Sequence, residues 1–214
     1  LTTRGIENWI LDIKGVKVQE LAAGTKQKIL RCLRTILDEA VRDEIINNNP
    51  AKMVTAPSDS ADDKKERRVF TLYEQKLLMP EDLIERIKLW GNIMWASYFS
   101  VLADTGMRPG EAMGLRVCDV YRTPQGYGVV AVQEVSTDGK KIKHRVKTSG
   151  KGMERRVALL SEGTGRLIEQ LVECQHITDD NECLFLKDRS KKDSYIGVYT
   201  ANKHMRGVLK KLGL

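Results

Sequence analysis

The most informative segment of the chain is Thr105-Gly-Met-Arg-Pro-Gly-Glu-Ala-Met-Gly-Leu115. Gly106 is suited to end a helix in the left-handed backbone region, and Pro109 is suited to the first turn of the next helix. The pattern therefore predicts a tight corner between two helices, with Arg108 at the start of the second. A guanidinium is planar and permanently charged, and it can bind a phosphate through two hydrogen bonds. We expect Arg108 to face a phosphodiester, with Glu111 bracing either the backbone or an arginine. An arginine considered by itself is more simply explained as a solvated corner residue.

A basic segment follows, Val146-Lys-Thr-Ser-Gly-Lys-Gly-Met-Glu-Arg-Arg-Val-Ala-Leu159. Between Lys140 and Arg156 the chain holds eight Lys or Arg residues and one acid, Glu154. Such a concentration of positive charge favours contacts with phosphate groups, and an exposed solubilising hairpin is the alternative. The candidate DNA contacts of this region are Lys141, Lys143, Arg145, Lys151 and Arg155.

The spacing of apolar residues in the amino-terminal part of the chain, residues 1–57, predicts two helices. In the second, which Thr25 opens, Ile29, Leu33, Ile36 and Leu37 belong to an apolar stripe. Three cations lie mainly on the opposite side, where they contact either DNA backbone or solvent: Lys28, Arg31 and Arg42.

The rest of the pattern predicts a mainly α protein with a small antiparallel β-sheet, an α+β fold in two domains. Residues 58–68 are polar and read as a linker between residues 1–57 and residues 69–214. Thr71-Leu-Tyr-Glu74 has the pattern of a capping box that starts a new helix, and the apolar segment from Glu81 to Asp104 predicts a buried helix interrupted near Gly91. Three valine-rich or basic runs between residues 128 and 160 predict the sheet.

Composition narrows the class of partner. The 214 residues carry a formal charge of +7, which favours an acidic polymer or an acidic surface as the partner. Because 41% of the residues are hydrophobic, the chain can bury the core of a globular protein. No run is long and apolar enough for a membrane span, so we expect a cytoplasmic protein. Four scattered cysteines lack zinc-finger spacing, and the sequence predicts neither a metal site nor another cofactor.

The arginine stretch resembles the first arginine motif of the tyrosine recombinase, or phage integrase, family. The Lys147 segment looks like the lysine hairpin of that family, and residues 1–57, with Asn49-Pro50 near their end, look like the later half of its core DNA-binding domain. Residues from about 69 look like the first two-thirds of its catalytic domain. The order and spacing of the three regions agree with the family.

The resemblance implies a site-specific DNA recombinase that joins a tyrosine to the 3′-phosphate of a cut strand, without a metal. Arg108 would stabilise the phosphate, Lys147 would be the general acid that protonates the leaving oxygen, and Glu111 would support the arginine. Lys151, in the same turn, is the competing candidate for the acid. The implied partner is double-stranded DNA at an attachment site of a mobile genetic element in a bacterial cell, bound by four protomers.

The family's His-x-x-Arg box and tyrosine nucleophile find no match in these residues; His204-Met-Arg206 has the wrong spacing. The resemblance therefore implies an inactive internal fragment of a larger recombinase. A non-catalytic DNA-binding protein on the same scaffold is the alternative, and a basic adaptor for an acidic protein is a third hypothesis.

Overall fold

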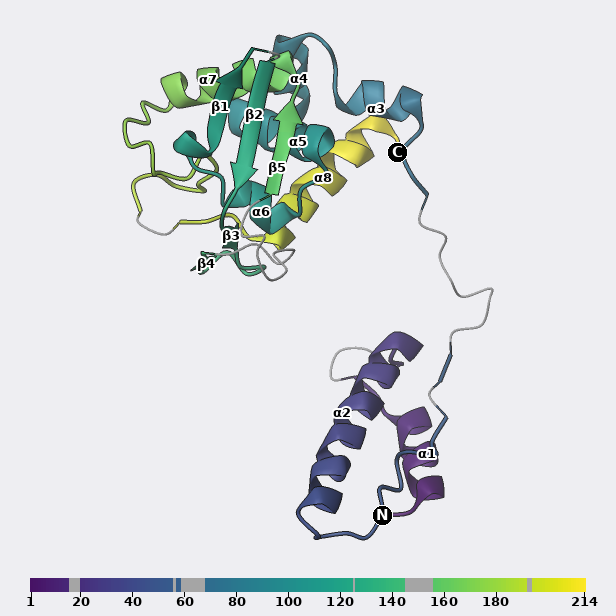
Figure 1. Ribbon diagram of the computed structural model, residues 1–214. Coiled ribbons are helices and arrows are strands. Elements are labelled where there is room, and N and C mark those ends of the chain that lie inside the picture. The colour runs from purple at the N-terminus through teal and green to yellow at the C-terminus, as the bar shows by residue number, and fades with distance from the viewer. Residues whose placement is uncertain (16–19, 56, 59–67, 125, 145–155, 192–193) are drawn as a thin grey trace. The chain divides into compact units, whose positions relative to one another are not determined.

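The computed structural model describes residues 1–15, 20–55, 57–58, 68–124, 126–144, 156–191 and 194–214. The chain divides into two compact units, Leu1–Val69 and Phe70–Leu214, and each unit has a hydrophobic core of its own. The elements are helices with a small antiparallel sheet (Figure 1), which confirms the predicted α+β fold class.

The first unit contains a pair of helices, α1 (Thr3–Asp12) and α2 (Ala23–Arg42). Thr2 caps α1, because its side-chain oxygen accepts a hydrogen bond from the Gly5 N–H at 3.1 Å. Helix α2 begins at Ala23, before the predicted start at Thr25, and its first residue is not preceded by a capping side chain. The core of this unit consists of Ile6, Ile10, Leu30, Leu37, Ala51 and Val54.

The apolar stripe of α2 is only partly buried. Leu30 and Leu37 lie in the core, whereas Ile36 is 59% exposed, and Trp9 on α1 is 43% exposed. Helical spacing determines which residues share a face, but burial needs a second surface against that face. In the described part of this unit, α1 and the loop after α2 cover a narrower strip than the stripe predicts.

Side chains tie that loop to α2. The buried Asn49 donates from Nδ2 to the backbone oxygen of Arg34 and to Oδ1 of Asp38, each at 2.9 Å. Arg34 in turn donates from Nε to the backbone oxygen of Ala51 at 2.9 Å and from Nη2 to that of Val54 at 2.5 Å. The loop therefore packs on the helix through satisfied polar groups as well as through apolar contacts.

The second unit begins with three helices: α3 (Leu72–Leu78), α4 (Leu83–Trp90) and α5 (Ile93–Thr105). The predicted capping box at Thr71 is present, because Thr71 accepts from the Glu74 N–H and Glu74 accepts from the Thr71 N–H. The predicted interruption is also confirmed: Gly91 ends α4 with a φ of 84°, a backbone angle that favours glycine.

The sheet follows the short helix α6 (Pro109–Met113) and the 3-10 helix η2 (Val117–Asp119). Strands β1 (Val120–Thr123), β2 (Gly126–Ala131) and β5 (Arg156–Leu160) pair antiparallel in the order β1-β2-β5. Strands β3 (Glu134–Val135) and β4 (Ile142–Lys143) form a separate two-stranded ribbon. The run from Gly128 to Val135 is thus divided between β2 and β3.

Helices α7 (Glu162–Cys174) and α8 (Val198–Leu212) complete the unit. Helices α5 and α7 lie along one face of the three-stranded sheet (Figure 1), and the inward side chains of the sheet include Tyr127, Val129 and Leu160. Tyr98 and Phe185, both fully buried, pack edge to face in this core with ring centroids 5.5 Å apart. The core holds α5 against the sheet, and α5 leads directly into the predicted arginine corner.

Candidate functional site

The corner after α5 has the predicted geometry. Gly106 follows the helix with a φ of 57°, and its N–H donates to the backbone oxygen of Leu102 at 3.0 Å. Met107 is buried and anchors the corner, and Arg108 is the residue immediately before α6, with Pro109 at the first helical position. The backbone therefore places Arg108 between two helices whose positions are fixed by the core.

The backbone N–H of Arg108 is hydrogen-bonded within the corner, whereas its guanidinium is partly accessible to solvent. Glu111, which is fully buried, accepts the Arg108 backbone N–H at 2.9 Å and lies 3.2 Å from Nη1 of the guanidinium. The Arg108 side chain is 45% exposed. Within the described residues Glu111 is the side-chain partner of the guanidinium, and the remaining N–H donors can reach a ligand. The arrangement suits an anion with several oxygens, such as a phosphodiester.

The β3–β4 ribbon lies against the same short helix. A Cβ on Gly110 would come within 2.6 Å of the backbone oxygen of Val135, so the backbones of α6 and β3 are in close contact. Glu134 and Lys143 are paired across the ribbon, with Nζ of Lys143 3.5 Å from Oε1 of Glu134. Strand β4 is followed, after His144, by the segment that contains Lys147.

Lys147, the candidate general acid, lies outside the described residues, as do Arg145, Lys151 and Arg155. Both flanks of their segment are described. His144 follows β4, and Arg156 opens β5, where it pairs with Ala131 of β2. The structure therefore shows where the segment leaves and rejoins the fold, and the convergence of Lys147 with Arg108 stays a prediction.

The other predicted contacts are at the surface. Lys28 and Arg31 are exposed on α2, and Lys141 and Lys143 are exposed on the ribbon. Arg42 is exposed as well, but its Nη1 lies 2.6 Å from Oε2 of Glu39, so part of its charge is matched within the helix.

His204 has a packing role. Its ring stacks on Trp95 with centroids 4.4 Å apart, and its Nε2 lies 2.9 Å from the backbone oxygen of Trp90. These contacts join α8 to α4 and α5.

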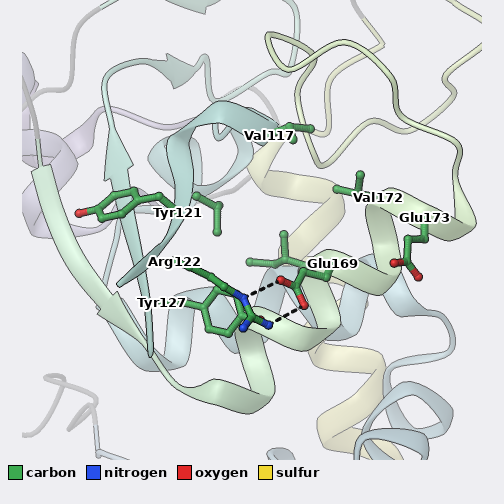
Figure 2. A pocket seen from close by; sticks show the side chains of 9 residues that line it. Val117, Tyr121, Arg122, Tyr127, Glu169, Val172 and Glu173 are labelled. Atoms are coloured by element: carbon green, nitrogen blue, oxygen red, sulfur yellow. Dashed lines mark hydrogen bonds and ion pairs between the residues drawn. The ribbon is translucent and has the colours of Figure 1, made fainter. Parts of the chain in front are cut away.

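A cavity of about 450 Å³ lies between β1, β2 and α7 (Figure 2). Its lining includes Arg122, whose guanidinium forms an ion pair with Glu169. Arg122 lies over the Tyr127 ring, and its Nε donates to Oε1 of Glu169 at 3.2 Å. The hydrogen bond from Arg122 holds the pKa of the Glu169 carboxyl below its usual range. Because Glu169 matches the charge of Arg122, we assign no phosphate to this cavity.

The described part of the chain shows neither a metal site nor a membrane-spanning helix. No cluster of three or more His, Cys, Asp or Glu side chains there could hold a metal ion, and all four cysteines are free. No helix among these residues is long and apolar enough to cross a bilayer.

The sequence did not reveal one polar residue near the corner, Gln133. Its side chain is buried at 6% exposure, and Nε2 donates to the backbone oxygen of Gly114 at 2.8 Å. A single glutamine between two strands carries no pattern that distinguishes it from a surface residue, so the contact becomes visible only in the fold.

No protein-family model and no curated protein sequence matches the chain. Among solved structures, the chain is similar to the Tn1549 transposon integrase in complex with circular intermediate DNA, with a TM-score of 0.68 and 16% identity over 100% of this chain. A structure of the same integrase in complex with transposon right end DNA matches 99% of the chain with a TM-score of 0.69 and 16% identity. The chain covers 64% and 65% of those two solved chains. The expected integrase-type fold is confirmed: this chain has the fold of the Tn1549 transposon integrase.

Proposed function

We propose that the protein is a site-specific DNA recombinase of the tyrosine type, with duplex DNA as its substrate. The observation that carries the proposal is the half-exposed Arg108 guanidinium, braced by the buried Glu111 at a corner of a fold shared with an integrase that was solved with DNA. The net charge of +7 is consistent with a nucleic-acid partner.

In the proposed reaction a tyrosine oxygen attacks the phosphorus of a DNA phosphodiester. A bond forms between that oxygen and the 3′-phosphate, the bond from phosphorus to the 5′-oxygen breaks, and the leaving oxygen takes a proton from the ammonium of Lys147. Arg108 donates hydrogen bonds to the non-bridging oxygens, whose negative charge grows in the transition state. No residue of the 214 matches the tyrosine or the His-x-x-Arg box of the family, so we propose that this chain by itself does not cleave DNA.

The two units have different proposed roles. Residues 1–57 contact the DNA backbone through the exposed cations of α2, Lys28 and Arg31, and residues 69–214 form the part of the catalytic domain that holds Arg108 and Lys147. The full-length protein acts as a tetramer on two duplexes of a mobile genetic element in this proposal, and a small-molecule substrate has no part in it.

A covalent trap tests the proposal. The full-length protein is incubated with nicked duplexes from the DNA that flanks its gene, and the protein–DNA adduct is measured on a denaturing gel. We expect an adduct from the unmodified protein and a cleavage rate about 10²- to 10³-fold lower for Arg108→Ala, because one transition-state donor is lost.

Arg166→Ala is the matched control, since Arg166 is an exposed helical arginine paired with Glu162 at 3.1 Å, as Arg108 is paired with Glu111. Its adduct yield should equal that of the unmodified protein. Equal yields from Arg108→Ala and Arg166→Ala would contradict the proposal. A full-length protein that binds the duplexes but never forms an adduct would instead be a non-catalytic DNA-binding protein.

A further inference from the structure

Thr105 is the last residue of α5, and its hydroxyl connects that helix to the corner that contains Arg108. Its Oγ1 donates a hydrogen bond to the backbone oxygen of Val101 at 2.6 Å and accepts one from the backbone N–H of Met107 at 3.1 Å. A hydroxyl has one hydrogen to donate and two lone pairs that accept, so both bonds can form together. The side chain therefore ties the start of the corner to a turn of α5 that lies in the core.

The peptide groups on the two sides of the Met107 Cα are held by different helices. The Met107 N–H is bound by Thr105 of α5, and the Arg108 N–H is bound by Glu111 of α6 at 2.9 Å. Because a peptide group is planar, a fixed N–H fixes the orientation of the whole group. Met107 is 4% exposed, so its side chain attaches the same segment to the core.

The backbone angles of Arg108 are restricted as well. The next residue is Pro109, and a residue before proline is confined to extended backbone. Arg108 has that conformation, with a φ of −67° and a ψ of 147°. The direction in which its side chain leaves the backbone therefore depends on the peptide group between Met107 and Arg108, and so on the hydrogen bonds that hold Met107 in place.

We propose that Thr105 is a positioning residue, whose hydroxyl directs the Arg108 guanidinium toward the phosphodiester by holding the backbone amide of Met107. The inference rests on the proposed function and goes beyond it, because it assigns a part in the reaction to a side chain that acts through the backbone. The contacts that carry it lie within residues 101–111, so they concern the arginine corner alone.

The inference predicts a defect in the rate of cleavage rather than in DNA binding. Duplex DNA is bound through many phosphate contacts, so a small displacement of one arginine changes the half-saturating DNA concentration little. The negative charge on the phosphate grows in the transition state, and a displaced guanidinium stabilises that charge less. Thr105→Val keeps the shape of the side chain and removes the hydroxyl, which leaves the Met107 N–H without this acceptor.

The experiment measures single-turnover adduct formation by the full-length protein on the nicked duplexes of the covalent trap. We expect Thr105→Val to lower the rate at saturating DNA by about tenfold and to leave the half-saturating DNA concentration within about twofold. Thr105→Ser retains a hydroxyl and should react within about threefold of the unmodified rate. Thr35→Val is the matched control, because the Thr35 hydroxyl also donates to the carbonyl four residues earlier, at 3.1 Å, but α2 continues beyond it. It should react as the unmodified protein does.

A double-mutant cycle tests whether Thr105 acts through the arginine. Thr105→Val in the Arg108→Ala protein should cause no further loss of rate, because no guanidinium is left to direct. Losses that multiply in the double variant would overturn the positioning role. An equal loss for Thr105→Val and Thr105→Ser, or a Thr105→Val protein as fast as Thr35→Val, would overturn it too.

Thermal melts accompany each assay. If Thr105→Val does not fold, Thr105→Ala replaces it in every comparison, since alanine also lacks the hydroxyl and adds no methyl group in its place. A failure of the proposed function looks different, because the unmodified protein would then form no adduct with the duplexes.

Discussion

At the scale of single residues, the site depends on a contrast between Arg108 and Glu111. The carboxylate is fully buried and the guanidinium is 45% exposed, so the pair is fixed on one side and open on the other. The buried Glu111 carboxylate accepts a hydrogen bond from the Arg108 backbone N–H at 2.9 Å, so it stabilises the backbone of the corner. Its contribution is therefore to the shape of the corner as well as to the charge of the arginine.

Replacement of Glu111 tests that role. Glu111→Ala leaves the partly buried Arg108 amide without this acceptor, and we expect the free energy of unfolding to fall by about 1–3 kcal/mol in urea titrations. Glu111→Gln retains a side-chain oxygen and should lose less. Glu162→Ala, which removes the acid of an exposed pair, should change stability by less than about 1 kcal/mol. A Glu111→Ala protein as stable as Glu162→Ala would show that the corner does not need its buried acid.

At the scale of elements, α2 and its following loop are joined through Asp38. Its Oδ1 accepts from Nδ2 of Asn49 at 2.9 Å and lies 3.2 Å from Nζ of Lys52. The hydrogen bond from Asn49, with that from Lys52, holds the pKa of Asp38 below its usual range. A carboxyl whose pKa is lower in the folded state stabilises the fold above its unfolded pKa, about 3.9, and loses that contribution as the pH falls through the folded value.

We therefore expect acid to loosen the contact between α2 and its loop. NMR amide exchange in α2, measured in the whole chain, should become faster as the pH falls below about 4, after correction for the intrinsic exchange rate. Asp38→Asn should reduce this pH dependence, while Asp43→Asn, a change at the end of the same helix, should retain it. Identical pH dependence in the Asp38→Asn chain would contradict the assignment.

Elements with local signals could be predicted from the sequence. The Thr71 capping box, the break at Gly91 and the corner at Gly106 depend on contacts within a few residues, and all three are present. Strand β1 was not predicted, since Val120–Thr123 acquires its conformation from pairing with β2. The contact of Gly110 with Val135 and the hydrogen bond from Gln133 to Gly114 depend on tertiary packing, so no sequence pattern indicates them.

At the scale of the whole molecule, two units share the proposed work on DNA. Phosphate contacts release counterions, so the binding constant of the full-length protein for duplex DNA should fall steeply with salt. We expect Lys28→Ala with Arg31→Ala to reduce the slope of log K against log salt by about two, because each cation contacts a phosphate in the proposal. Lys88→Ala, an exposed cation of α4 outside the predicted contacts, should leave the slope unchanged. An unchanged slope in the double variant would remove α2 from the DNA interface.

The proposed mechanism requires Arg108 and Lys147 to reach one phosphate. A crystal structure of the 214-residue chain grown with vanadate tests this directly, because vanadium can adopt the five-coordinate geometry that phosphorus has in the transition state. We expect one vanadate whose oxygens lie within about 3.2 Å of both the Arg108 guanidinium and the Lys147 ammonium. A vanadate bound by Arg108 while the Lys147 side chain points to another face of the unit would contradict it.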